Sequence, residues 1–352
     1  MAGGRVKVPV GRRARPRTVL GLLVLAVVSF VILGSSVGAA RVGPVSAGAM
    51  ILRRVGFSGI KPWWGEADEA ILFAIRLPQV VLAAIVGATL AASGAAFQGL
   101  FRNPMADPFV LGTSPGAALG ATIAIVLRLN VTYMGISSVP LFAFAGALLT
   151  SIAVYAMSRM RGAAPREVLL LTGIAFGSLL SSVTSLLMVL SSSDLSHVFF
   201  WIMGGLSGAT WSRVTMVLPY SLLGLALIMA SARELNLMLL GEEDAFHLGV
   251  DVERTKTRIL AAASLACAAA VAASGVVGFV GLMVPHTVRL LTGPDHRVFM
   301  PSALLAGAAI LLLADIISRV VLAPQEIPLG IVTAILGVPF FLFLLRRKEA
   351  GD

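Results

Sequence analysis

Asp315 and Arg319 are the residues whose types and spacing could do chemistry within this chain. Asp315 is the acidic residue that lies deepest inside a long apolar run, and Arg319 follows it four residues later. An acid followed by a base at this spacing shares one helix face in the favourable order. The pattern indicates an ion pair that orients Arg319. The alternative is a proton relay, because a carboxylate at membrane depth needs a partner or a function, but a single acid makes a poor relay.

Motifs for hydrolysis or metal binding are missing from the sequence. It contains no P-loop, no G-x-S-x-G and no H-E-x-x-H. The four histidines have no ligand spacing, and the single cysteine, Cys267, lies in an apolar run. We therefore expect no catalytic residues, no metal site and no cofactor, which disfavours an intramembrane enzyme.

The composition predicts an all-α integral membrane protein. Hydrophobic residues make up 58% of the 352 residues and charged residues 12%, and the mean hydropathy is +0.95, values outside the range of soluble proteins. A span needs roughly 20 apolar residues. Ten candidate spans lie at about 18–40, 72–100, 108–128, 139–159, 167–190, 211–232, 257–277, 279–292, 299–319 and 328–345.

These spans form one transmembrane domain, residues 18–345, between a basic tail (1–17) and a short C-terminal tail (346–352). With both termini in the cytoplasm, nineteen Lys and Arg residues lie on the cytoplasmic side and eight on the other, as the positive-inside rule requires. We interpret the net charge of +10 as a topology signal and a contact with anionic lipids, and expect no nucleic-acid binding. A retained first helix is expected rather than a cleaved export signal.

A broken segment, 98–116, interrupts the apolar pattern with Asn, Pro, Asp and Gly. Non-helical backbone at membrane depth survives only where protein or a water-filled cavity shields it, so this segment is a pathway candidate. Prolines disfavour helix at the preceding residue, and Asn and Asp cap helix ends. The structural residues predicted here are Asn103, Pro104, Asp107 and Pro108. Their turn could be a plain tight turn, or part of an inner gate or ATPase contact.

Two segments 181 residues apart resemble each other, AASGAAFQGLFRNP (91–104) and AASGVVGFVGLMVP, which ends at Pro285. In the predicted topology they run in opposite directions, so the fold would consist of two inverted halves, with a substrate path at their interface. A chance likeness between helices rich in small residues is the alternative.

The run RLPQVVLAAIVGATLAASGAAFQGLFRNPMADPFVLGTSPGAALG (76–120) closely resembles the FecCD family of permeases, the membrane subunits of bacterial ABC importers for iron-siderophores, haem and cobalamin. GEEDAFHLGV (241–250), GFVGLMVPHTVRLL (278–291) and LLLADIISR…EIPLGIVTAILGVPFF (311–340) agree with it. The resemblance implies ten helices per subunit, a homodimer around a central path and a place in the bacterial inner membrane. It also implies two cytoplasmic ATPase subunits and a periplasmic or lipid-anchored binding protein as partners.

The loop 233–257 joins the sixth and seventh spans. In the family it forms short cytoplasmic helices that sit in a cleft of the ATPase, although a solvated linker would show the same charge pattern. The resemblance implies a coupling role for Gly241, Glu242, Glu243, Asp244, Ala245, His247, Leu248 and Gly249.

Arg76 and Arg319 match family arginines that meet acidic residues of the binding protein, where charge pairing sets orientation. Gln79 stands where many relatives carry a further arginine, which reduces the docking charge. Ordinary snorkelling to the interface is the alternative for both arginines.

A mildly polar translocation path is predicted along the second and fifth spans, although most such side chains simply bond a neighbouring helix or the preceding turn. Its candidates are Gln98, Ser181, Ser182, Thr184 and Ser185. The loop at Ala164 offers no gate residues.

The sequence therefore predicts a permease subunit that imports an iron complex or cobalamin by ATP-driven alternating access. The competing class is an ion-coupled secondary transporter built on inverted repeats. Such a carrier needs ion ligands near the midplane, and Asp315 is the acid available.

Overall fold

The computed structural model describes residues 16–38, 42–129, 132–133, 136–159, 165–191 and 194–349. Most of the predicted N-terminal tail, residues 350–352 of the C-terminal tail and Ala164 lie outside the described residues. The helices and strands are α1 (Pro16–Ser36), α2 (Pro44–Arg54), α3 (Glu66–Ala70), the π-helix η1 (Ile71–Arg76), α4 (Leu77–Leu100), the 3₁₀-helix η2 (Pro108–Leu111), α5 (Thr113–Val126), β1 (Thr132–Tyr133), β2 (Ile136–Ser137), α6 (Ser138–Ser158), α7 (Arg166–Leu190), α8 (Leu195–Ile202), α9 (Trp211–Ala230), α10 (Ala232–Met238), α11 (Glu242–His247), α12 (Val252–Ser274), α13 (Val280–Thr292), α14 (His296–Val320) and α15 (Leu329–Glu349).

The order of these helices follows the predicted spans. Seven helical stretches of the described chain are long and apolar enough to cross a membrane, and the second of them runs unbroken over Glu66–Leu100. Thr113–Val126 and Leu329–Phe343 are shorter apolar helices. α5 is short because η2 and the glycine at its start use part of the predicted span 108–128. α13 occupies nearly the whole of the short predicted span 279–292.

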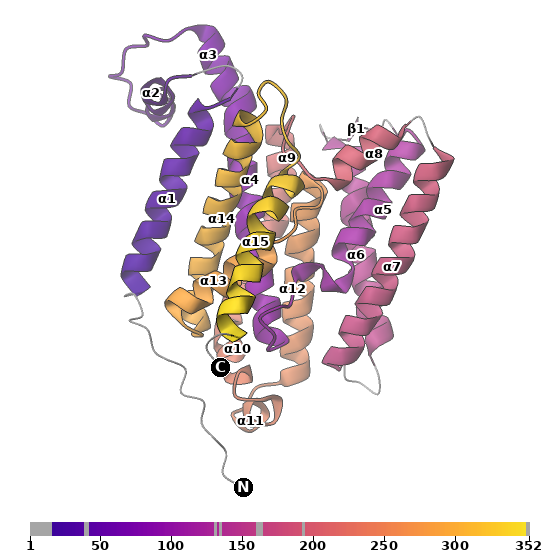
Figure 1. The fold of residues 1–352 in the computed structure, drawn as a ribbon. Coiled ribbons are helices and arrows are strands. Elements are labelled where there is room, and N and C mark those ends of the chain that lie inside the picture. Colours follow the sequence, from indigo (N-terminus) through magenta and orange to yellow (C-terminus); the bar gives the residue numbers. More distant parts are fainter. Residues whose placement is uncertain are drawn as a thin grey trace.

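The long helices stand side by side in one bundle (Figure 1). α4, α12 and α14 form its centre, since 83%, 78% and 61% of their most apolar windows are buried, against 11% for α1 and α7. The central helices approach closely because small residues face each other, as where Gly87 of α4 meets the backbone of Gly307 on α14. Close backbone approach at small residues is the usual way in which membrane helices associate.

The two ends of the bundle differ. α10 and α11 lie at one end, here called the α11 end, while α2, α3 and α8 lie at the other, here called the α3 end (Figure 1). At the α3 end, β1 and β2 form a two-residue antiparallel ladder that pairs Thr132 with Ser137. α4 runs from the α3 end to the α11 end and α12 runs back (Figure 1), as inverted halves require.

The two similar segments adopt different local structures. In the first, Ser93 and Gly94 lie inside α4, whereas in the second, Gly275 ends α12 with a φ of 67°. A left-handed φ suits glycine because it lacks a Cβ. The two segments also contact each other, because Gln98 of α4 donates its Nε2 to the Leu282 carbonyl of α13 at 2.9 Å. The two similar segments thus lie in contact with each other in the fold, and their origin as a repeat stays a prediction.

Candidate functional site

A buried polar cluster at the α3 end contains Asp315 and Arg319. The Arg319 Nη2 atom lies 2.6 Å from Asp315 Oδ2, and both side chains are 1% exposed. Gln79 of α4 donates its Nε2 to Asp315 Oδ1 at 3.0 Å. Both carboxylate oxygens thus have a donor, which is what a buried charge requires.

The same cluster caps the end of α1. Arg319 Nη1 donates to the carbonyls of Gly34 and Val37 at 2.9 and 3.0 Å, and Arg76 Nη1 donates to that of Val37 at 3.0 Å. The last carbonyls of a helix lack partners within it, and cations there also complement the helix dipole. In the isolated chain Arg76 is 6% and Arg319 3% exposed. The guanidinium groups of both arginines thus face inward in the isolated chain. Docking of a binding protein through these two arginines stays a prediction.

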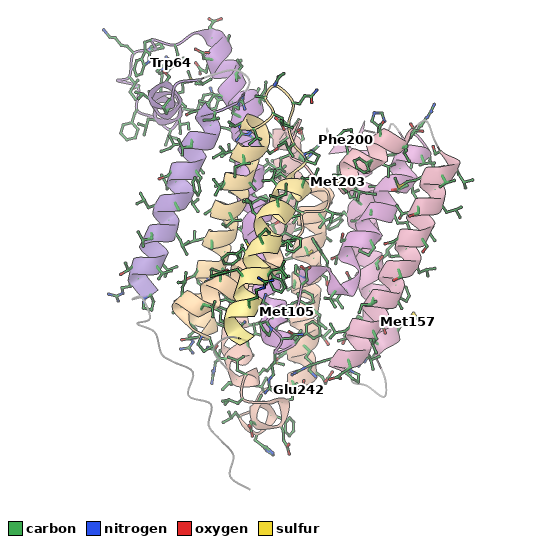
Figure 2. The ribbon with its side chains drawn as sticks, viewed as in Figure 1. Trp64, Met105, Met157, Phe200, Met203 and Glu242 are labelled. Atoms are coloured by element: carbon green, nitrogen blue, oxygen red, sulfur yellow. The ribbon has the colours of Figure 1, made fainter. Side chains whose placement is uncertain are left out.

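The predicted coupling loop folds into α10 and α11 at the opposite end. α11 projects beyond the long helices (Figure 1), and Glu242 stands at its base (Figure 2). Ala245 is fully buried, whereas Phe246 is 67% and Leu248 56% exposed. Glu243, Asp244, His247 and Gly249 are also exposed. α11 thus presents an apolar edge within an acidic surface.

Glu242 fixes α11 to two long helices. Its Oε1 lies 2.6 Å from Arg166 Nη2 on α7, and its Oε2 lies 2.6 Å from Lys256 Nζ on α12. Burial alone would raise the pKa of Glu242, but the hydrogen bond and charge of Lys256, with those of Arg166, hold the pKa below its ordinary value. The carboxylate therefore stays ionised and bridges α7 and α12.

Further polar contacts fix α10. The Asn236 amide donates to Asp295 Oδ1 at 2.7 Å, and its carbonyl oxygen accepts from the His296 backbone at 2.8 Å. Glu234 pairs with Arg258 of α12 at 3.0 Å. Arg166, Lys256, Asn236 and His296 were missed by the sequence prediction. The sequence does show that these polar residues lie at the ends of apolar spans. It does not show which of them contact one another.

The broken segment begins as an exposed turn at Arg102, Asn103 and Met105 and then enters the bundle at η2, where Pro108 and Leu111 are buried. Met105 is in the half of the molecule nearer the α11 end (Figure 2). Asn103 Oδ1 accepts from the Met105 backbone at 2.9 Å, and Asp107 Oδ1 accepts from that of Phe109 at 2.7 Å, just before Pro108 starts η2. η2 packs against α7 and α12. Pro285 lies within α13 and is buried.

The predicted path residues separate into two environments. Gln98 is fully buried against α13. Ser181, Ser182 and Ser185 are exposed on α7, while Thr184 is buried. Ser182 and Ser185 donate to the carbonyls four residues earlier, both at 2.9 Å. With their hydroxyls satisfied within the helix, these serines form a mildly polar surface and not a fixed binding site.

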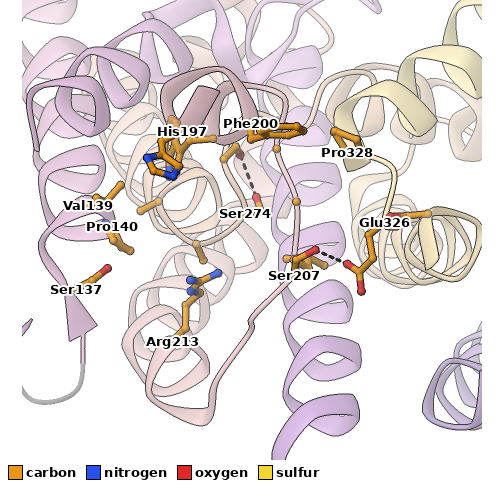
Figure 3. Close-up of a pocket in the computed structure, with 18 of the residues that line it drawn as sticks. Ser137, Val139, Pro140, His197, Phe200, Ser207, Arg213, Ser274, Glu326 and Pro328 are labelled. Carbon is orange, nitrogen blue, oxygen red and sulfur yellow. Dashed lines mark hydrogen bonds between the residues drawn. The ribbon is translucent and has the colours of Figure 1, made fainter. Parts of the chain in front are cut away.

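A cavity of about 480 Å³ opens near the α3 end, between α8, the start of α9 and the loop before α15. His197 and Arg213 point into it from different elements, and Ser207 donates to Glu326 on another wall (Figure 3). Charged and hydroxyl groups thus line a space next to apolar Phe200 and Pro328.

Comparison with known proteins agrees on one family. The model of the FecCD transport family matches residues 22–347. The chain is 50% identical over 284 residues to the cobalamin import system permease protein BtuC of Halobacterium salinarum, covering 81% of this chain and 75% of that one. It is 39% identical over 346 residues to the hemin transport system permease protein HmuU of Yersinia pestis, covering 96% and 98%. A metal-chelate-type ABC transporter solved in an inward-facing conformation is similar with a TM-score of 0.80 and 29% identity, covering 95% of this chain and 100% of that one.

Proposed function

Because the chain belongs to the FecCD transport family and is a membrane permease subunit of an ABC importer, we propose that its cargo is a metal chelate. Cobalamin is the first candidate, because half of the aligned residues match a cobalamin permease. Haem is the second, since the similarity to a hemin permease extends over nearly the whole length of both chains.

The subunit lies in the cytoplasmic (inner) membrane with its α11 end in the cytoplasm. α1 begins and α15 ends at the α11 end (Figure 1), and the excess of Lys and Arg predicted for the cytoplasmic side supports this orientation.

The observation that carries the proposed mechanism is the way α11 is mounted. The helix exposes Phe246, and Leu248 just after its last residue is also exposed, while Glu242 joins its base to α7 and α12. A separate ATPase that closed around these apolar side chains would push on two long helices at once. ATP hydrolysis by that partner thus drives alternating access, and this chain contributes the moving walls.

The functional unit is a homodimer with two ATPase subunits and a substrate-binding protein. The serine surface of α7 supports the position of the path: Ser181, Ser182 and Ser185 lie on the exposed side of a helix that otherwise shows apolar side chains such as Ile174 and Leu186. A second copy facing this surface would enclose a path with few strong binding groups, which suits the passage of a large chelate.

The Asp315 contacts argue against an ion-coupled carrier. Both carboxylate oxygens accept hydrogen bonds, one from Arg319 and one from Gln79. An ion-coupling site instead needs ligands that can release and rebind the ion. The pair stabilises the α3 end of the bundle instead.

Reconstituted transport tests these proposals. Proteoliposomes holding the chain with its ATPase and binding protein receive labelled cobalamin, haem or a ferric siderophore, with and without ATP. We expect ATP-dependent uptake of one cargo. Uptake that follows a proton gradient and ignores ATP would overturn the mechanism.

The coupling role of α11 is tested by a matched pair of variants. Phe246→Ala removes a ring that is 67% exposed from α11, whereas Phe57→Ala removes a similarly exposed ring (62%) at the α3 end. We expect Phe246→Ala alone to reduce uptake and ATPase binding several-fold. Equal effects of the two variants would remove α11 from the mechanism.

A further inference from the structure

The segment 44–64 at the α3 end exposes large apolar side chains outside the helix bundle. Val45 is 75%, Val55 74%, Phe57 62%, Trp63 61% and Leu52 49% exposed. Leaving so many apolar groups in water is unfavourable, and a contiguous set of them marks an interaction surface. The transport mechanism derived above does not use this segment.

α2 has two apolar faces. One face packs on the molecule, where Ala47 and Met50 form a small cluster of their own with Leu72. Val45 and Leu52, seven residues apart and so on the same side of a helix, form the uncovered face. α2 appears end-on beside the end of α1, whose axis runs along the bundle (Figure 1). The axis of α2 therefore lies across the bundle. A helix in this orientation would lie parallel to the surface of a membrane that the bundle crosses.

The position of α2 favours lipid as the occupant of this face. α2 projects outward on the side of α1, away from the central helices (Figure 1). α1 itself is largely uncovered, with Leu22 and Leu25 both 62% exposed, so it faces acyl chains. α2 begins eight residues after the end of α1, whose 21 residues match the length of a membrane span. A helix that follows a span so closely is expected near the boundary between acyl chains and headgroups.

The positions of the charged side chains also favour lipid as the occupant. Arg53, Arg54 and Lys61 lie within the segment and form no ion pair in the described part of the chain, although the Arg54 guanidinium lies 5.4 Å from the centre of the Phe73 ring. The nearby acids Glu66, Asp68 and Glu69 belong to α3, which extends farther from the bundle than α2 (Figure 1). Basic groups thus lie at the proposed headgroup level, and acidic groups lie beyond it.

We propose that α2 and the loop 55–64 form an interfacial anchor, with Val45, Leu52 and Phe57 at the acyl boundary and the basic side chains on lipid phosphates. An amphipathic helix with a basic border binds a membrane surface through the burial of its apolar side chains and through the attraction of its basic side chains to anionic lipids. Tryptophan, here Trp63, is also enriched at the membrane–water interface. This proposal goes beyond the transport function, because it requires neither the ATPase nor a cargo.

Depth measurements with a spin label test the anchor. Leu52→Cys and Phe57→Cys variants of the full chain are labelled with a nitroxide in liposomes, with Glu66→Cys as the control on α3. The native Cys267 is fully buried, so labelling is directed to the introduced thiol. We expect positions 52 and 57 to collide preferentially with oxygen, which dissolves in lipid, and position 66 with a water-soluble nickel chelate. Nickel-chelate collisions at all three positions would overturn the proposal.

A second experiment separates lipid from a protein partner. Arg53→Gln with Arg54→Gln is compared with Arg233→Gln, an exposed arginine at the α11 end, in bilayers with and without phosphatidylglycerol. In bilayers with phosphatidylglycerol, the label at position 57 should lie deeper than in bilayers without it. The double variant should lose most of this difference and the control should keep it, because each basic residue near an anionic surface changes binding roughly fivefold. Protection at positions 52 and 57 that appears only with the binding protein would assign the surface to that protein instead. Neither experiment depends on uptake, so a failed transport assay leaves both results readable.

Discussion

Gly94 of α4 packs directly against the backbone of Gly281 on α13, so that a Cβ added at Gly94 would overlap the Gly281 carbonyl oxygen. The two glycines come from the two similar sequence segments. Backbone cannot move aside as a flexible side chain can, so this contact fixes the separation of α4 and α13.

Gly94→Ala should therefore destabilise the protein strongly. Overpacking in a core costs about 1–3 kcal/mol, and we expect the upper end of that range because the obstacle is main chain. Gly21→Ala is the matched control, since Gly21 lies in α1 and a Cβ there meets no atom within 4 Å. That variant should be neutral or slightly stabilising. Thermal unfolding in detergent measures both, and equal melting temperatures would contradict the packing account.

Asp315→Asn should destabilise the α3 end, because Arg319 would keep its charge in a buried site without a counter-charge. Breaking a buried pair on one side costs about 3–5 kcal/mol, whereas replacing both partners by apolar residues is far milder. Asp315→Leu combined with Arg319→Leu should thus recover part of the loss. Thermal unfolding of the single and double variants checks the order, and a double variant less stable than Asp315→Asn would argue against a simple ion pair.

Asp315→Asn, together with Arg319→Gln, also tests docking of the binding protein. We expect Asp315→Asn and Arg319→Gln to weaken binding-protein affinity indirectly, since both disturb the contacts that hold the end of α1. Binding to the permease in nanodiscs measures this effect. Unchanged affinity in folded variants would mean that the cluster is purely structural.

Glu242→Gln should uncouple hydrolysis from transport. The neutral side chain loses both ion pairs, with Arg166 and with Lys256, so α11 no longer moves α7 and α12 together. We expect uptake per ATP hydrolysed to fall several-fold. Glu167→Gln is the control, because Glu167 lies next to Arg166 at the start of α7, outside the coupling loop, is exposed and forms no ion pair in the described part of the chain. A similar uptake-to-hydrolysis ratio in both variants would contradict the role given to Glu242.

Acid should release the base of α11. The pKa of Glu242 lies below its ordinary value of 4.5, so its ion pairs contribute in full above that value and are lost as pH falls through the lowered pKa. Protection of α11 from limited proteolysis should therefore persist from pH 7 to about pH 5 and fall below that range. In Glu242→Gln the protection should be weaker and should not change with pH. An unchanged acid transition in that variant would assign it to another group.

The class of protein and the helix order were predictable from sequence, because both depend on local composition. A run of about 20 apolar residues can bury its backbone polar groups in a membrane only as a helix, whatever its neighbours are. The breaks at Pro104 and Pro108 were equally local, since proline restricts the residue before it whatever surrounds it. The Asp315 and Arg319 pair was also visible, because four residues along one helix fix their separation.

Contacts between helices could be found only from the tertiary structure. Nothing in the sequence places Gln79 beside Asp315, 236 positions apart, or Glu242 between Arg166 and Lys256. The inward direction of Arg76 and Arg319 depends on where α1 ends, and the sequence does not say where that end lies in space. Sequence thus determined which segments cross the membrane, because that depends on each segment alone. Tertiary structure decided which polar groups meet, because that depends on how separate helices pack.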